Sequence, residues 1–226
     1  MVAFVRRFDE NYQDAYEQIQ KGAIGKPIII RSQGNEKLDQ SPFYKDSLRS
    51  SGGIFIDSVI HDIDLSLLFF GENSTPKSVS AAGAAAIHDE LAETGDANNA
   101  VGICEFWDGK VAYFYHSRTA AHGNDNPMEI FGTAGKLSIY LHNRRNRVEL
   151  CQGSIKIEAL PSWYDRYVSA FVTETQTWVD ALLDKKPMPI PIQCALTSLV
   201  IATGLQESLK TGLRIHFERD LTRKVR

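Results

Sequence analysis

The chain has few of the features that mark disulfide-bonded, zinc-binding or membrane proteins. Its three cysteines, Cys104, Cys151 and Cys194, lie far apart and form no Cys-x-x-Cys pair. An odd number of distant cysteines argues against a disulfide framework or a zinc site, and fits a reducing compartment. No apolar run is long enough to span a membrane, and the N-terminus carries Arg6 and Arg7 where a signal peptide needs an apolar core. We therefore expect a cytoplasmic protein that does not bind membranes.

A surplus of positive charge and a nucleotide-binding loop are also missing. The formal net charge is −3, which gives no electrostatic reason to expect a nucleic acid partner. No Gly-x-Gly-x-x-Gly motif lies between a strand and a helix, so the fingerprint of a dinucleotide site is absent. The segment Gly132–Lys136 has the wrong spacing for a phosphate loop and is better interpreted as a turn between strands. We expect no cofactor to bind to this chain alone.

The chain is interpreted as one α+β domain, residues 1–226, because no linker or internal repeat divides it. Helical periodicity predicts a helix after the N-cap residue Asp9, one that contains Asp57 and His61 and ends at Gly71, and two long ones at about residues 165–183 and 193–210. Strands are predicted at about residues 27–31, 79–86, 100–107, 110–117, 128–132, 136–141, 147–151, 154–160 and 213–217. A polar loop is expected over residues 34–51. Consecutive hairpins, with helices gathered at both ends of the chain, indicate an antiparallel sheet.

The stretch from Gly52 to Asp64 has the strongest chemical signal. Asp57, His61 and Asp64 are spaced four and three residues apart, so on a continuous helix they would share one face beside an apolar stripe. A titrating His with an acid one turn earlier suits general acid–base chemistry at neutral pH. The alternative is a partly buried His that a neighbouring Asp satisfies structurally.

The same stretch also resembles a known family. Gly-Gly-x-x-x-Asp-x-x-x-His-x-x-Asp, from Gly52 to Asp64, resembles the signature of the Gfo/Idh/MocA oxidoreductases, in particular the inositol 2-dehydrogenase-like branch. Further segments resemble other family motifs in the same order: Val2–Asp9, Ser117–Arg118, Glu129–Gly132 and Arg166–Phe171. The resemblance covers almost the whole chain and corresponds to the second domain of those enzymes. It implies an open, mostly antiparallel sheet with helices packed on one face, whose other face forms a homo-oligomer interface.

The resemblance also implies roles for individual residues. His61 would exchange the proton of the substrate hydroxyl, and Asp57 would bind and orient a polyol or sugar-like molecule. Arg6 matches a position that reaches the substrate, although a structural ion pair is the alternative. In full-length relatives a Rossmann domain binds NAD(P), and a Glu-Lys-Pro motif supplies a catalytic lysine. Neither is present in this sequence.

The substrate region departs from the inositol enzymes. Where they have Tyr-Gly-Tyr-Asp, this chain has His122-Gly123-Asn124-Asp125, so His122, Asn124 and Asp125 are candidate substrate-binding residues. Smaller polar groups change the shape and hydrogen bonding of a pocket, so inositol itself is not the expected substrate. Asp64 is either a pocket hydrogen-bonding group or a surface charge, and His122 either a second titrating group or an exposed loop residue. No further His or acid is placed to complete a metal shell around Asp57, so we expect no metal.

Three functions remain open. The leading one is the substrate-binding and oligomerisation half of an NAD(P)-dependent polyol or sugar dehydrogenase, which would not transfer hydride alone. The second is a stand-alone, non-redox enzyme, such as a dehydratase, isomerase, epimerase or cyclase, that uses Asp57 and His61 as an acid–base pair. The third is a non-catalytic dimerisation or ligand-binding module.

Overall fold

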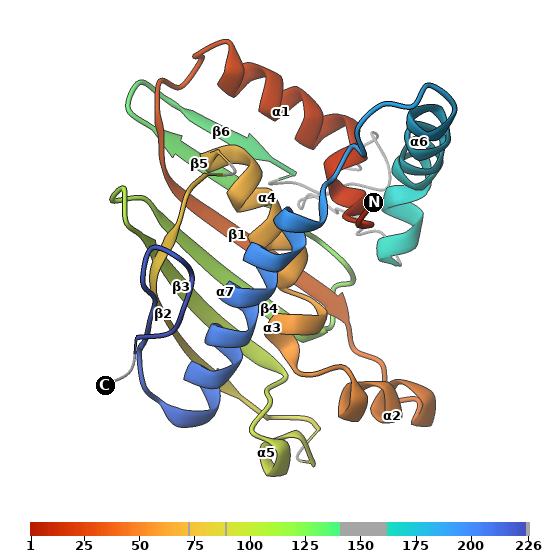
Figure 1. Cartoon of the computed structure of the whole chain (residues 1–226). Helices are drawn as coiled ribbons and strands as arrows, with labels where there is room; N and C mark the ends of the chain where they lie inside the picture. The colour runs from red at the N-terminus through yellow and green to blue at the C-terminus, as the bar shows by residue number, and fades with distance from the viewer. Residues whose placement is uncertain (72, 89, 141–161, 225–226) are drawn as a thin grey trace, which may run out of the picture.

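The computed structural model describes residues 1–71, 73–88, 90–140 and 162–224. A seven-stranded sheet with the strand order β6-β5-β1-β4-β3-β2-β7 forms one layer, and helices lie across one of its faces (Figure 1). The strands are β1 (Pro27–Lys37), β2 (Pro76–Ala84), β3 (Asn99–Phe106), β4 (Val111–Ala120), β5 (Met128–Gly132), β6 (Lys136–Ile139) and β7 (Ile215–His216). Only β1 and β4 pair in parallel among the described strands; the other pairs are antiparallel. The predicted open, mostly antiparallel α+β sheet is confirmed.

Capping side chains mark the start of several helices. The helical elements are the short 3-10 helix η1 (Val5–Phe8) and α1 (Glu10–Gln20), α2 (Pro42–Ser50), α3 (Ile54–Asp57), α4 (Ile60–Phe70), α5 (Glu90–Thr94), α6 (Trp163–Leu183) and α7 (Ile192–Thr211). The Asp9 side chain accepts hydrogen bonds from the backbone N–H groups of Asn11 and Tyr12, as expected of an N-cap. Ser162 caps α6 in the same way, through the N–H of Asp165.

Two details differ from the sequence-based predictions. Residues 34–51 are not a loop, since β1 continues to Lys37 and α2 follows. Ser41 caps α2 through the N–H of Tyr44, and Pro42 occupies its first turn, so a polar segment begins a helix on capping signals alone. The helix expected to contain both Asp57 and His61 is divided into α3 and α4, so the two side chains come from consecutive helices. The strands predicted at residues 147–151 and 154–160 lie outside the described residues.

The sheet buries one face and leaves the other open. In β3, Ala100, Cys104 and Phe106 point to the helices, and a Cβ added to Gly102 would meet the Phe55 ring at 2.8 Å. On the opposite face, Ile29 and Ile103 are 44% and 39% exposed, as the two-residue period of strands requires. In the described part of the chain, no helix is both long and apolar enough to cross a membrane.

Candidate active site

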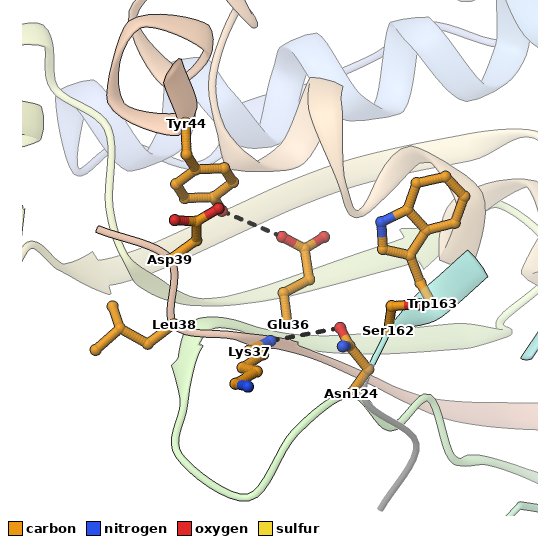
Figure 2. A pocket seen from close by; sticks show the side chains of 8 residues that line it. All are labelled: Glu36, Lys37, Leu38, Asp39, Tyr44, Asn124, Ser162 and Trp163. Atoms are coloured by element: carbon orange, nitrogen blue, oxygen red, sulfur yellow. Dashed lines mark hydrogen bonds between the residues drawn. The ribbon is translucent and has the colours of Figure 1, made fainter. Parts of the chain in front are cut away.

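A cavity of about 440 Å³, the central cavity, opens between η1, the end of β1, the α2–α4 segment and α6. Its lining includes Arg6, Glu36, Tyr44, Asp57, His61, Asn124, Trp163, Tyr167, Phe171 and Glu174. A second basin of about 450 Å³ shares Glu36, Tyr44, Asn124 and Trp163 with it, and Figure 2 shows these four among the side chains that line the second basin. Four of the predicted site residues, Arg6, Asp57, His61 and Asn124, therefore line one cavity.

His61 is held neutral at the start of α4. Its Nδ1 is buried without a hydrogen-bond partner among the described residues, and its ring packs edge-on against Phe4 with 5.9 Å between centroids. Burial first, and the nearby Arg6 guanidinium second, lower the pKa of His61 to about 4. A neutral imidazole can accept a proton from a bound hydroxyl group.

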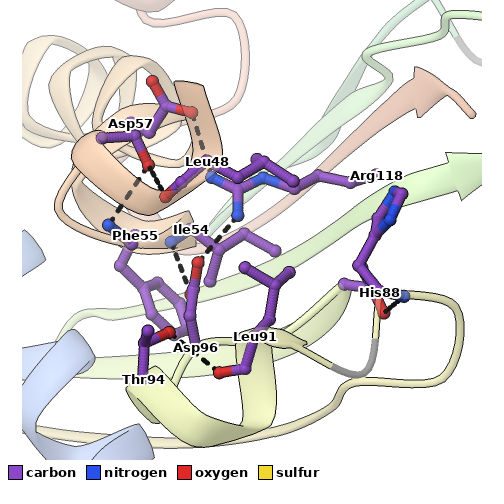
Figure 3. A network of polar contacts seen from close by, with 12 residues as sticks. Leu48, Ile54, Phe55, Asp57, His88, Leu91, Thr94, Asp96 and Arg118 are labelled. Atoms are coloured by element: carbon purple, nitrogen blue, oxygen red, sulfur yellow. Dashed lines mark hydrogen bonds and ion pairs between the residues drawn. The ribbon is translucent and has the colours of Figure 1, made fainter. Parts of the chain in front are cut away.

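Asp57 is positioned by an arginine rather than by His61. Arg118 has no exposed surface and donates from Nη2 to Asp57 Oδ2 at 3.0 Å and from Nη1 to Asp96 Oδ2 at 2.9 Å (Figure 3). No hydrogen bond joins Asp57 to His61 among the described residues, although both line the same cavity. Burial raises the pKa of Asp57 while Arg118 opposes the rise. The carboxylate therefore faces the cavity with one oxygen already bound from behind.

The same network fixes the N-terminus of α3. The backbone N–H of Ile54 donates to Asp96 Oδ1 at 2.9 Å, and that of Phe55 donates to Gln206 Oε1 at 3.2 Å. Gly53 precedes them with φ 110°, and a Cβ there would lie 2.3 Å from the Gln206 side-chain amide. The glycine pair of the motif thus lets α3 approach α7 closely and sets the position of Asp57.

Glu36 is a cavity residue that the sequence analysis did not assign. It stands near the end of β1, where Tyr44 Oη donates to Oε2 at 3.4 Å and His116 Nε2 lies 3.3 Å from Oε1. Burial opposes its ionisation, but His116 and Arg118 nevertheless lower the pKa of Glu36 to about 2. The residue was missed because the strand was expected to end at Arg31, and no local pattern reveals that β1 carries Glu36 into the cavity.

Glu174 and Tyr167 were also not assigned to the site. With Phe171 they occupy one face of α6 at spacings of four and three residues, and all three line the cavity. The Tyr167 hydroxyl and Glu174 Oε1 are buried without hydrogen-bond partners among the described residues. Burial raises the pKa of Glu174. An acid at a core-facing position of an otherwise apolar stripe is the sequence signal that could have identified it.

Arg6 and Asp64 both form ion pairs. Arg6 lines the cavity but also donates from Nη1 to Asp62 Oδ1 at 2.8 Å, so the pocket and ion-pair interpretations both describe it. Asp64 is 1% exposed and accepts two hydrogen bonds of 2.8 Å from Arg7, one on each oxygen. It is neither a surface charge nor a residue lining the central cavity.

The predicted substrate loop is divided. Asn124 lines the central cavity, whereas the exposed His122 contacts Asp125 through Nε2 at 3.2 Å. Asp125 pairs with β1 at Asn35 and lines a separate small cavity with Arg31 and Glu129. Neither His122 nor Asp125 lines the central cavity, although Asp125 accepts a hydrogen bond from Asn35, which does.

The turn at Gly132–Lys136 does not offer its backbone to a nucleotide phosphate. In the turn between β5 and β6, the N–H groups of Gly132, Thr133 and Ala134 donate to the carbonyls of Gly135, Lys26 and Ile24. These N–H groups are therefore occupied and cannot bind a phosphate. The described part of the chain also has no group of three or more His, Cys, Asp or Glu side chains that could hold a metal ion.

Residues 12–138 match the family model of the GFO/IDH/MocA C-terminal domain. The chain belongs to this family. It is 29% identical over 95% of its length to a Myo-inositol 2-dehydrogenase of Thermotoga maritima, and 29% identical over 96% of its length to a scyllo-inositol 2-dehydrogenase (NAD(+)) of Bacillus subtilis. It spans 63% and 62% of those proteins.

The fold agrees with this assignment. A scyllo-inositol dehydrogenase from Lactobacillus casei, crystallised with bound NAD(H) and scyllo-inositol, superposes with a TM-score of 0.88 at 28% identity, over 96% of this chain and 64% of that one. The chain thus corresponds to less than two thirds of the length of each of these family members.

Proposed function

We propose that this chain is the substrate-binding half of an NAD(P)-dependent polyol or sugar dehydrogenase, and that it does not transfer hydride alone. The observation that supports this most directly is the meeting of Arg6, Asp57 and His61 at one cavity in a chain whose relatives are inositol dehydrogenases. The nicotinamide, bound outside the described residues, would accept the hydride from the polyol. This chain would supply the pocket and the proton acceptor.

His61 is proposed as the acid–base residue, and Asp57 as a hydrogen-bond acceptor that orients the polyol. A neutral imidazole is the correct form to take the hydroxyl proton during oxidation. Asp57 keeps one face to the cavity because Arg118 binds it from behind. Glu36 is ionised and accepts hydrogen bonds from hydroxyl groups equally well. Several acceptors around a small cavity suit a ligand with many hydroxyl groups.

The proposal is tested by binding and by turnover. Myo-inositol and other polyols are titrated into the chain by calorimetry or NMR, with Asp57→Asn and His61→Ala as variants and His122→Ala as the matched control outside the cavity. We expect the first two variants to weaken binding and the control to leave it unchanged. Polyol oxidation by this chain with added NAD(P) at an ordinary enzymatic rate would contradict the proposal. Turnover without nicotinamide, lost in His61→Ala, would instead support a stand-alone acid–base enzyme.

A homo-oligomer through the helix-free sheet face is the second part of the proposal. Ile29, Ile103 and the aromatic rings of Tyr113 and Tyr115 lie on this face, and the two isoleucines are substantially exposed. A broad apolar sheet face is usually covered by another layer. A second copy of the same face would provide that layer.

A further inference from the structure

Acidic groups outnumber basic groups around the central cavity. Glu36, Asp57 and Glu174 line it, and Asp62 and Asp96 stand directly behind. The basic groups beside them are the three arginines Arg6, Arg118 and Arg166, the last of which donates to the cavity residue Asn126. The cavity therefore has a negative potential, which attracts cations and repels anions.

Glu174 differs from the other acids in this set. Asp62 pairs with Arg6, Asp57 and Asp96 pair with Arg118, and Glu36 contacts His116. Glu174 is only 7% exposed, and its Oε1 has no partner among the described residues. A buried carboxylate oxygen without a partner costs free energy unless a ligand provides a donor.

The surroundings of Glu174 suit a positively charged donor. Phe171 lies one turn before it on α6 and packs against Trp163, with 6.1 Å between ring centroids. Aromatic faces beside a carboxylate favour an ammonium group through cation–π attraction and charge-assisted hydrogen bonds. The unpartnered hydroxyl of Tyr167, two turns before Glu174, is available for a ring hydroxyl of the same ligand.

We propose that the central cavity selects a polyol or sugar that carries a protonated amino group, with the ammonium bound at Glu174 and the ring hydroxyls directed to Tyr167, Asp57 and His61. This deepens, and rests on, the proposed polyol-binding function. A neutral polyol would leave Glu174 without a partner. A sugar acid would add a further negative charge to a cavity that Glu36, Asp57 and Glu174 already line.

The test compares three ligands of similar size. Myo-inositol, an inosamine in which one inositol hydroxyl is replaced by an amine, and glucuronate are titrated into the chain at pH 7. A charge-assisted hydrogen bond to a buried carboxylate leads us to expect about tenfold tighter binding of the inosamine than of myo-inositol, and weaker binding of glucuronate than of either. In Glu174→Gln the ratio of the two dissociation constants is expected to fall to about one.

Asp180→Asn is the matched control, because Asp180 lies on the same helix and is exposed outside the cavity. It should keep the preference for the amine, and thermal unfolding should show that Glu174→Gln remains folded. Binding of myo-inositol as tight as that of the inosamine, or tighter, would overturn the amine preference while leaving polyol binding intact. So would an unchanged ratio of the two dissociation constants in Glu174→Gln. Failure of all three ligands to bind would overturn both proposals.

Discussion

Arg118 binds Asp57 at 3.0 Å and Asp96 at 2.9 Å, so one fully buried guanidinium joins a cavity residue to the α3 cap. Arg118→Met removes this link and leaves the buried Asp96 carboxylate without its cation. We expect a loss of about 3–5 kcal/mol in the free energy of unfolding, measured by urea denaturation. Arg118→Lys keeps the charge but not the two-pronged geometry, and should recover part of the loss. Equal stability of the wild type and Arg118→Met would contradict this account.

The neutral state of His61 makes stability depend on pH. The pKa of His61 is lowered to about 4 in the native state, so between that pH and its ordinary value of 6.5 the unfolded chain binds more protons. The stability that depends on a neutral His61 is fully present above pH 6.5 and is lost as the pH falls toward 4. The slope should approach about 1.4 kcal/mol per pH unit. Unfolding free energies across this range should show a shallower slope in His61→Gln, while exposed His122→Gln should match the wild type. A slope that His61→Gln does not change would contradict the prediction.

Asp64 is expected to stabilise the fold without contacting substrate. Asp64→Asn weakens the two hydrogen bonds from Arg7 and removes the buried negative charge that this arginine binds at 2.8 Å. We expect a destabilisation of about 3–5 kcal/mol by chemical denaturation. The polyol dissociation constant of the folded variant should stay within about twofold, whereas Asp57→Asn should raise it by about tenfold. If Asp64→Asn changed the free energy of polyol binding more than the free energy of unfolding, Asp64 would be a substrate-binding residue and the prediction would be wrong.

The open sheet face is expected to control self-association. Ile103→Lys places a charge in the middle of that face, because β3 lies between β4 and β2 in the sheet. Desolvating a lysine at an interface is costly, so sedimentation equilibrium should show a shift toward monomers. Phe43→Lys is the control, since Phe43 is 85% exposed on α2, away from the sheet. An unchanged association constant for Ile103→Lys would place the interface elsewhere.

Some features followed from local sequence because their causes are local. Asp9 caps α1 through its own neighbours, as predicted. The strands predicted at about residues 100–107 and 110–117 are present as β3 and β4, and Asp108-Gly109 lies in the tight turn between them. The family motif also pointed to Asp57 and His61, and both line the central cavity. Their proposed chemistry stays a prediction.

Other features depended on distant contacts. Spacing alone could not reveal how α3 begins, because its first N–H groups are bound by Asp96 and Gln206 from far along the chain. The sequence left Asp64 as either a pocket group or a surface charge, and it is neither, because the fold brings Arg7 to it in a buried ion pair.

The order of residues along the chain was enough to predict the family, most of the strands and helices and the acid–imidazole motif, because periodicity, caps and turns act within a few residues. It could not predict which carboxylates face the cavity and which are neutralised behind it. Ion pairing and burial depend on what the folded chain brings alongside each group. Arg7 was brought to Asp64, whereas Glu174 Oε1 met no donor among the described residues.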